Sequence, residues 1–387
     1  MKFGFDRIFD RRNTGSLKWD KYKGKDIIPM WVADMDFQAP PAVLDALHER
    51  VEHGIFGYAS PPDELIKVVV ERLEAKYQWK IKPYWIVWLP GLVPALNVVC
   101  RAFADDKDEI LTFTPIYPPF LSGPVLAGKT LKAIPLRREG GLFTFDIERL
   151  QSEISARSKV LLLCNPHNPV GRRYSRRELK DVAETCLRHN LVICSDEIHC
   201  DLILDGGEHV PIATLGSEIS DITITLMSPS KTFNLPGLNC AFAVIENEGL
   251  RRRFTKSRKG IVPGVNALGF AACLAVYRDG EDWRKELIEY LRGNRDFVRR
   301  FVNDEIQRLS MDNVEATYLA WIDCRELQIR NPAGFFLQAA IGLSNGRDFQ
   351  GEGYVRLNFG CPRETLSEAL DRMKHAVTNL VGQPQAE

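Results

Sequence analysis

Three residues whose side chains could take part in one reaction lie in the middle of the chain. They are Asn168, Asp196 and Lys231, and they are separated by 28 and 35 residues. A lysine amine forms an imine with an aldehyde, and a carboxylate held against a pyridine nitrogen keeps that nitrogen protonated, so that the ring accepts electrons. Ser228 and Ser230 lie beside the lysine and could donate hydroxyl groups to a phosphate. This set of residues fits an enzyme that uses pyridoxal phosphate.

Each of these residues also has an ordinary structural interpretation. A lysine in a serine-rich loop is most often a solvated surface residue, and Asp196 could cap the helix that follows it. The order of the residues, and their place just after predicted strands, favours the chemical interpretation.

The elements that must position these residues are typical of a parallel sheet. Residues 160–164 form an apolar run that ends at a loop, and Ser175 and Glu178 then form a capping box at the start of an amphipathic helix. Further apolar runs cover residues 191–194 and 222–227. Strand, helix and strand in this order predict a βαβ unit. Ligands of open α/β sheets bind at the carboxyl ends of the strands, where the candidate residues lie.

The outer parts of the chain have a different pattern. Long amphipathic patterns cover residues 283–302 and 366–380, and candidate strands lie between them at residues 318–324 and 354–359. This pattern predicts a second, smaller α+β domain beside an α/β domain whose mostly parallel sheet lies between helices. The predicted domains are a large one, residues 50–282, and a small one that combines residues 1–49 with residues 283–387.

The composition argues against several other kinds of protein. The chain has 387 residues, with 51 Lys and Arg against 51 Asp and Glu, so it lacks the basic excess expected of a nucleic-acid-binding protein. No apolar stretch approaches the roughly 20 residues of a membrane span, and the charged N-terminus does not read as a secretory signal. The nine cysteines include no Cys-x-x-Cys pair, so we expect neither a disulfide framework nor a metal site. We expect a cytoplasmic protein that acts on a small molecule, with no nucleic-acid or membrane partner.

One motif points to a different ligand. Residues 123–130 match the Gly-x-x-x-x-Gly-Lys-Thr pattern of a phosphate-binding loop. Such a loop needs a helix directly after its lysine, whereas residues 131–135 alternate like a strand and end at a proline. We therefore interpret the match as accidental.

Seven short segments of the sequence resemble one known family. They are residues 29–37, 56–58, 165–169, 195–199, 228–234, 318–321 and 356–363. The resemblance runs from Phe5 to about Val381 and is to the fold-type I pyridoxal phosphate enzymes of the class I/II aminotransferase superfamily, and within it to the cystathionine β-lyases of the MalY/PatB type. It implies the fold of that class and a homodimer whose active sites are shared between the subunits.

The resemblance implies a role for each residue near the cofactor ring. Lys231 would bind the cofactor aldehyde and carry a proton, Asp196 would pair with the ring nitrogen, and Asn168 would donate to the phenolic oxygen. Tyr117 would stack on the ring and count with Lys231 and Asp196 as catalytic, the alternative being a loop tyrosine that only packs. Arg356 would bind the substrate α-carboxylate with its two-pronged guanidinium, the alternative being an exposed strand arginine.

The phosphate would be held by other residues. Gly91, Leu92 and Val93 precede a proline at a predicted helix start and would offer backbone amides and the helix dipole, although a helix start alone also explains them. Tyr58 would reach the neighbouring subunit's phosphate and substrate across the dimer interface.

Two residues depart from the pattern of the aspartate-type aminotransferases. Asn239 lies near the position of an arginine that grips the phosphate, and His199 stands where a tyrosine contacts the phenolic oxygen. Both differences favour the β-lyase branch. We treat His199 as a candidate cofactor neighbour, with a histidine satisfied at a sheet edge as the alternative, and we expect a structural role for Arg363.

The implied reaction is an α,β-elimination that cleaves cystathionine or another S-conjugate of L-cysteine to thiol, pyruvate and ammonia. Transamination to a 2-oxo acid shares its early steps, and the sequence does not separate the two. A hypothesis of another class is a regulatory binding protein that keeps the fold. Because the set of candidate residues is intact, we expect that the protein has kept its enzymatic activity.

Overall fold

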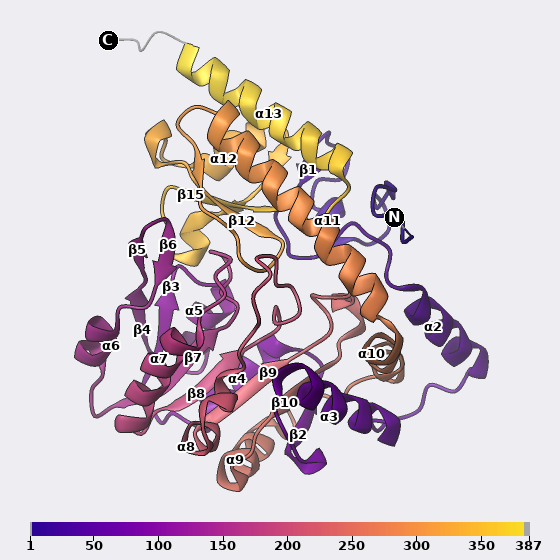
Figure 1. Cartoon of the computed structure of the whole chain (residues 1–387), viewed down its shortest axis with the longest axis vertical. Helices are drawn as coiled ribbons and strands as arrows, with labels where there is room; N and C mark the ends of the chain where they lie inside the picture. Colours follow the sequence, from indigo (N-terminus) through magenta and orange to yellow (C-terminus); the bar gives the residue numbers. More distant parts are fainter. Residues whose placement is uncertain (1, 383–387) are drawn as a thin grey trace.

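The structure is a computed structural model that describes residues 2–382. Two main sheets organise the chain, one of seven strands and one of four. Figure 1 shows the larger sheet in the lower part of the view and the smaller one above it, beneath the long C-terminal helices.

The large sheet is mostly parallel. Its strands follow the order β2-β10-β9-β8-β7-β3-β4, and β10 runs antiparallel to both of its neighbours. The predicted strands near residues 160, 191 and 222 are confirmed as β7, β8 and β9. The bounds are β2 (Ile86–Leu89), β3 (Glu109–Thr114), β4 (Thr130–Pro135), β7 (Ser158–Cys164), β8 (Val192–Asp196), β9 (Thr223–Met227) and β10 (Ala241–Val244).

Helices cover both faces of this sheet. Alternate residues of β7 pack against α4 (Leu92–Ala102) on one face and against α7 (Arg176–Arg188) on the other. A strand that is buried on both faces has a continuous apolar sequence, so β7 can be predicted from the sequence alone. The predicted capping box at the start of α7 is confirmed, because Ser175 and Glu178 exchange both hydrogen bonds. The other helices of this region are α2 (Pro41–His53), α3 (Asp63–Tyr77), α5 (Pro118–Leu126), α6 (Ile147–Glu153), α8 (Ser217–Asp221), α9 (Glu248–Arg258) and α10 (Ala267–Asp279).

The small sheet is antiparallel, with the strand order β11-β12-β15-β14. The two long amphipathic patterns are confirmed as helices α11 and α13, which lie side by side in Figure 1 and pack against this sheet. The bounds are β11 (Ser310–Met311), β12 (Leu319–Asp323), β14 (Ser344–Asn345), β15 (Tyr354–Asn358), α11 (Glu281–Arg300), α12 (Pro332–Gln338) and α13 (Arg363–Gly382). A hairpin of β5 (Arg137–Glu139) and β6 (Leu142–Thr144) extends from the large sheet.

The N-terminal segment connects the two parts of the molecule. After α1 (Leu17–Asp20), strand β1 (Ile28–Pro29) pairs in parallel with β13 (Ile341–Gly342). Residues 31–36, which we call the N-terminal strap, then cross toward the large sheet. The predicted domain boundaries fall within α2 and α11, and that division of the chain stays a prediction.

The phosphate-loop match has the wrong structural context, as predicted. Gly123 lies inside α5, and the threonine that ends the motif begins strand β4 instead of a helix. Within residues 2–382, no helix is long and apolar enough to cross a membrane, and no group of three or more His, Cys, Asp or Glu side chains is placed to hold a metal ion. The nine cysteines are buried and form no disulfide.

Candidate active site

The carboxyl ends of β7, β8 and β9 bring the three central candidates together. Cys164 is in register with Asp196, and Asp196 is in register with Leu226, so the loops that carry Asn168 and Lys231 leave the sheet beside Asp196. All three candidates line one cavity of about 940 Å³. The predicted position of a ligand at this edge of the sheet therefore coincides with a real cavity.

The cavity gathers nearly all of the predicted site residues. Those that line it are Gly91, Leu92, Val93, Tyr117, Asn168, Asp196, His199, Ser228, Ser230, Lys231 and Arg356, together with Asn239. Tyr58 does not line it. Its side chain is fully exposed in the loop between α2 and α3.

Asp196 is a buried carboxylate at the end of β8. Its Oδ1 accepts a hydrogen bond of 3.1 Å from the amide of Ile198, so the local capping contact that its position suggested is present as well. Burial raises the pKa of Asp196 to about 7, although this amide and the nearby Lys231 ammonium both oppose the shift. A cationic ring nitrogen is the kind of partner that would stabilise its charged form.

The Lys231 amine is held by the N-terminal strap. Its Nζ donates to the carbonyl oxygen of Ala33 at 2.5 Å, and the hydroxyl of Tyr318 donates to the same oxygen at 2.9 Å. Burial, and then the positive charge of Arg356, lower the pKa of Lys231 to about 8. An amine with this pKa is available as a nucleophile and base near neutral pH.

Arg356 is buried in the middle of β15, so the alternative of an exposed strand arginine is wrong. Its Nη1 donates to Asn168 Oδ1 at 3.0 Å, and its Nη2 donates to the carbonyl oxygen of Trp31 at 2.7 Å and to Ser344 Oγ at 3.3 Å. Its Nε is buried and has no hydrogen-bond partner among residues 2–382. Burial lowers the pKa of Arg356 to about 10. A buried, positively charged donor with a free N–H is suited to a carboxylate.

Asn168 and Tyr117 are tied to each other through the backbone. The amide of Tyr117, which precedes helix α5, donates to the carbonyl oxygen of Asn168 at 3.1 Å. The His167 ring fixes the same loop, with 2.8 Å between its Nε2 and the Pro115 oxygen and 3.0 Å between its Nδ1 and the Tyr174 hydroxyl. The tyrosine ring and the asparagine amide are therefore positioned on one wall of the cavity.

The cavity also contains groups that can hold an anion. Helix α4 begins at Leu92, and Gly91 precedes it without a side-chain cap, so the first amides of the helix are available to a ligand. Ser228 and Ser230 line the same cavity, and their hydroxyls are 2.9 Å apart. Free amides, a helix dipole and hydroxyls are the groups that bind phosphate.

His199 is buried in the cavity wall, and its ring lies 6.0 Å from that of Tyr318 in an edge-on arrangement. Its Nδ1 has no hydrogen-bond partner in the part of the chain that the structure describes, so the alternative of a histidine that is satisfied at a sheet edge is wrong for this atom. Burial, and then the charges of Lys231 and Arg356, lower the pKa of His199 to about 3. The imidazole is therefore neutral at physiological pH.

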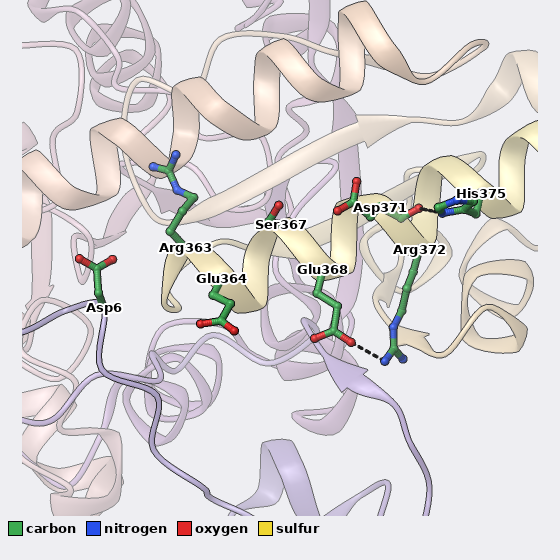
Figure 2. A pocket seen from close by; sticks show the side chains of 8 residues that line it. All are labelled: Asp6, Arg363, Glu364, Ser367, Glu368, Asp371, Arg372 and His375. Atoms are coloured by element: carbon green, nitrogen blue, oxygen red, sulfur yellow. Dashed lines mark hydrogen bonds and ion pairs between the residues drawn. The ribbon is translucent and has the colours of Figure 1, made fainter.

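Arg363 lies outside the cavity, at the start of α13. Its Nε donates to Asn294 Oδ1 at 2.8 Å, and its guanidinium lies 4.6 Å from the centre of the Phe297 ring. Figure 2 shows Arg363 at one end of a separate groove along α13, together with Asp6 and several charged residues of that helix. These contacts are structural, as expected for this residue.

The sequence interpretation assigned no role to the strap, although the segment was part of the resemblance. Trp31, Val32 and Ala33 line the cavity. The strap is held by two asparagines: Asn358 Nδ2 donates to the carbonyl oxygens of Val32 at 2.7 Å and Asp34 at 2.6 Å, and Asn234 exchanges two hydrogen bonds with the backbone of Met35. Other cavity residues that sequence reasoning missed belong to the small sheet and its loops, namely Leu343, Ser344, Asn345, Asp348 and Phe349, and to the N-terminal segment, namely Leu17 and Lys21.

The residues present fit pyridoxal phosphate. Two buried polar atoms in the cavity wall, Arg356 Nε and His199 Nδ1, have no partner within the described chain. The uncapped start of α4 suits the phosphate, Asp196 suits a protonated ring nitrogen, and the amine of Lys231 suits the aldehyde. The chain can therefore provide a group for each functional part of this cofactor.

A sheet of this order with a lysine, an aspartate and an arginine in one cavity defines the fold-type I class of pyridoxal phosphate enzymes. The chain belongs to the family "Aminotransferase class I and II", whose sequence pattern matches residues 25–373. The cystathionine β-lyase PatB of Bacillus subtilis (strain 168) is 38% identical over 97% of this chain and 100% of its own length. The predicted resemblance is confirmed.

Two solved structures have nearly the same fold. The crystal structure of OvoB has a TM-score of 0.95 and 46% identity, and the match covers 97% of this chain and 99% of that one. The crystal structure of cystalysin from Treponema denticola, which contains a pyridoxal 5′-phosphate cofactor, has a TM-score of 0.95 and 32% identity and covers 98% of this chain and all of the other. The predicted fold is confirmed.

Proposed function

We propose that the chain is a pyridoxal phosphate-dependent carbon–sulfur β-lyase, which cleaves cystathionine or another S-conjugate of L-cysteine to thiol, pyruvate and ammonia. The observation that carries this proposal is the single cavity in which Lys231, Asp196 and Arg356 face the same space. The 38% identity with the cystathionine β-lyase PatB, over 97% of this chain and 100% of that one, supports the β-lyase activity over transamination.

The bound cofactor supplies an acceptor for the electrons of the bond that is broken at the substrate Cα. Around it, Asp196 would hold a negative charge for the ring nitrogen, Asn168 would donate its amide to the phenolic oxygen, and Tyr117 would stack on the ring. Ser228, Ser230 and the amides of residues 91–93 would bind the phosphate. These assignments agree with the positions of the side chains in the cavity wall.

The substrate is oriented by Arg356 and deprotonated by Lys231. The guanidinium, with its free Nε, binds the α-carboxylate and so fixes the direction of the Cα–H bond. The Lys231 amine accepts the Cα proton, and its lowered pKa allows it to do so near neutral pH. The carbonyl oxygen of Ala33 is the acceptor that holds this amine while it is not bonded to the cofactor.

We also propose a cytoplasmic homodimer in which Tyr58 of one subunit completes the site of the other. The support is the position of Tyr58: it is fully exposed, outside the cavity, and follows two other exposed large apolar residues, Ile55 and Phe56. An exposed apolar loop of this kind is typical of an interface. Nine unpaired cysteines agree with a reducing compartment.

The experiment that tests the proposal measures the products. Purified protein is loaded with pyridoxal phosphate and supplied with cystathionine, and thiol and pyruvate are quantified against 2-oxo acid formation with an added acceptor. We expect thiol and pyruvate in equal amounts and no activity for Lys231→Ala, with the exposed Lys180→Ala as the matched control. Amino transfer without thiol release would show that the protein is a transaminase instead. If the protein stays colourless after the cofactor is added, it is a binding protein and not an enzyme of this class.

A further inference from the structure

The lining of the cavity includes two charged side chains that the proposed chemistry does not use. Lys21 and Asp348 both line the cavity, and both are exposed. Within residues 2–382, neither takes part in an ion pair with another side chain. The cavity, at about 940 Å³, is at the upper end of the size of ligand pockets, and it has to hold both the cofactor and the substrate.

Lys21 is connected to the carboxylate site through one residue, Trp31. Its ammonium lies 3.9 Å from the centre of the Trp31 ring, a distance at which a cation is attracted to an indole. The ring is fixed by a hydrogen bond of 3.2 Å from its Nε1 to the Lys18 oxygen. The carbonyl oxygen of the same tryptophan accepts from Arg356 at 2.7 Å. The positive charge of Lys21 therefore lies against a residue that Arg356 also contacts.

Asp348 is connected to the same arginine through the next residue, Phe349. The Phe349 ring is buried, and the Arg356 guanidinium lies 4.7 Å from its centre. The neighbour on the other side, Arg347, pairs with Glu352 at 3.6 Å and so does not neutralise Asp348. Arg356 thus contacts two aromatic residues: the Lys21 ammonium lies against the ring of Trp31, and Asp348 directly precedes Phe349 in the chain.

We infer that Lys21 and Asp348 form a subsite for the leaving thiol, and that they select S-conjugates of L-cysteine whose thiol part is charged, with a carboxylate placed near Lys21 and an ammonium near Asp348. The inference rests on the proposed lyase function and names its substrate class. A thiol part that is itself an amino acid satisfies both charges at once, whereas a small neutral thiol satisfies neither.

The test compares conjugates that share the cysteine half and differ in the charge of the thiol part. The probes are S-ethyl-L-cysteine (neutral), S-(2-carboxyethyl)-L-cysteine (anionic), S-(2-aminoethyl)-L-cysteine (cationic) and L-cystathionine (zwitterionic). Thiol release gives kcat/KM for each, and each charged conjugate is expressed as a ratio to the neutral one. The ratio removes any general loss of folding or of cofactor from the comparison.

We expect Lys21→Met to lower the ratio for the anionic conjugate about two- to fivefold, the effect of one solvent-accessible ion pair, and to raise the ratio for the cationic one. Asp348→Asn is expected to have the opposite effect. Both variants lower the ratio for cystathionine, and added salt reduces the differences. The matched controls are Lys23→Met and Glu326→Gln, exposed residues that do not line the cavity, and they leave the ratios unchanged.

Equal ratios in the original protein and in both variants would overturn the inference while the lyase function stands, because thiol would still be released. A wild-type protein that releases thiol from none of the four conjugates would overturn the lyase function itself, and the inference with it.

Discussion

The clearest quantitative prediction concerns the attachment of the N-terminal strap through Asp36. This carboxylate is only 5% exposed. Its Oδ2 accepts from Lys18 Nζ at 2.6 Å, and its Oδ1 accepts from Arg11 Nη1 at 2.6 Å and Trp19 Nε1 at 2.9 Å. Burial alone raises the pKa of Asp36, but Lys18, Trp19 and Arg11 outweigh it, and the pKa is lowered. The substitution Asp36→Asn keeps the shape of the side chain and removes its charge.

The expected loss of stability follows from the buried Lys18 charge, which the substitution leaves without its main partner. Lys18 is fully buried, and its nearest other carboxylate, Asp34, is 3.8 Å away and already bonded to Arg11. Removing one partner of a buried ion pair costs about 3–5 kcal/mol, because the remaining charge is uncompensated. Since Asp34 offers partial compensation, we expect the lower end, about 3 kcal/mol. That free energy corresponds to an increase of about 10²-fold in the equilibrium constant for opening of the segment.

Amide hydrogen exchange reports this opening directly. The amides of Ile28 and Met30 donate to the carbonyl oxygens of Ala340 at 3.0 Å and Gly342 at 2.7 Å, so they exchange only when the segment detaches. We expect their exchange to accelerate about 10²-fold in Asp36→Asn, and less in the double variant Lys18→Met/Asp36→Asn, which removes the uncompensated ammonium as well.

The matched control is Asp26→Asn, in the same segment. Asp26 is 81% exposed and pairs with Arg372, so its loss should cost under about 1 kcal/mol. The reasoning is refuted if Asp36→Asn leaves the exchange of these amides unchanged, if Asp26→Asn accelerates it equally, or if the double variant opens more readily than the single one.

Three further predictions concern the cavity. Lys231→Ala should abolish covalent attachment of the cofactor, which borohydride reduction and peptide mapping detect; a reduced label on another peptide would contradict the assignment. Arg356→Lys keeps the charge but loses the two-pronged geometry, so we expect kcat/KM to fall about 10- to 100-fold, the worth of one charge-assisted hydrogen bond, chiefly through KM; an unchanged KM would place the carboxylate elsewhere. The pKa of Asp196 is raised from 3.8 to about 7 in the chain without cofactor, so the folded state binds this proton more tightly than the unfolded state. Stability should therefore fall, by up to about 4 kcal/mol, as the pH rises from about 4 to about 7. Asp196→Asn should flatten this part of a urea-midpoint profile, and an equally steep profile in the variant would show that another group is responsible.

The part of the site that the sequence predicts well is the part that local rules position. Asn168, Asp196 and Lys231 each follow a buried strand within a few residues, and parallel strands end at a common edge. The capping box at Ser175 and the double-sided burial of β7 are equally local, so their bounds were predicted within a few residues.

The part that the sequence does not predict depends on contacts between distant segments. Trp31 meets Arg356 across 325 residues, and Asn358 holds the carbonyl oxygen of Val32 across 326. No periodicity or spacing encodes such contacts, because each partner is an ordinary loop or strand residue in its own neighbourhood. The subsite residues Lys21 and Asp348 were missed for the same reason: a surface lysine and a surface aspartate have no local signal.

The contacts of the strap also set the order in which the molecule can be completed during translation. Residues 31–36 leave the ribosome early, whereas Arg356, Asn358 and Gly360, which bind the strap, are among the last tenth of the chain. At about 5–20 residues per second, the interval between the two is about 16–64 s. A nascent chain therefore carries Lys231, the proposed cofactor lysine, well before it carries Arg356, the proposed substrate-binding residue. A transcript cut short ahead of β15 yields a polypeptide that lacks this arginine altogether.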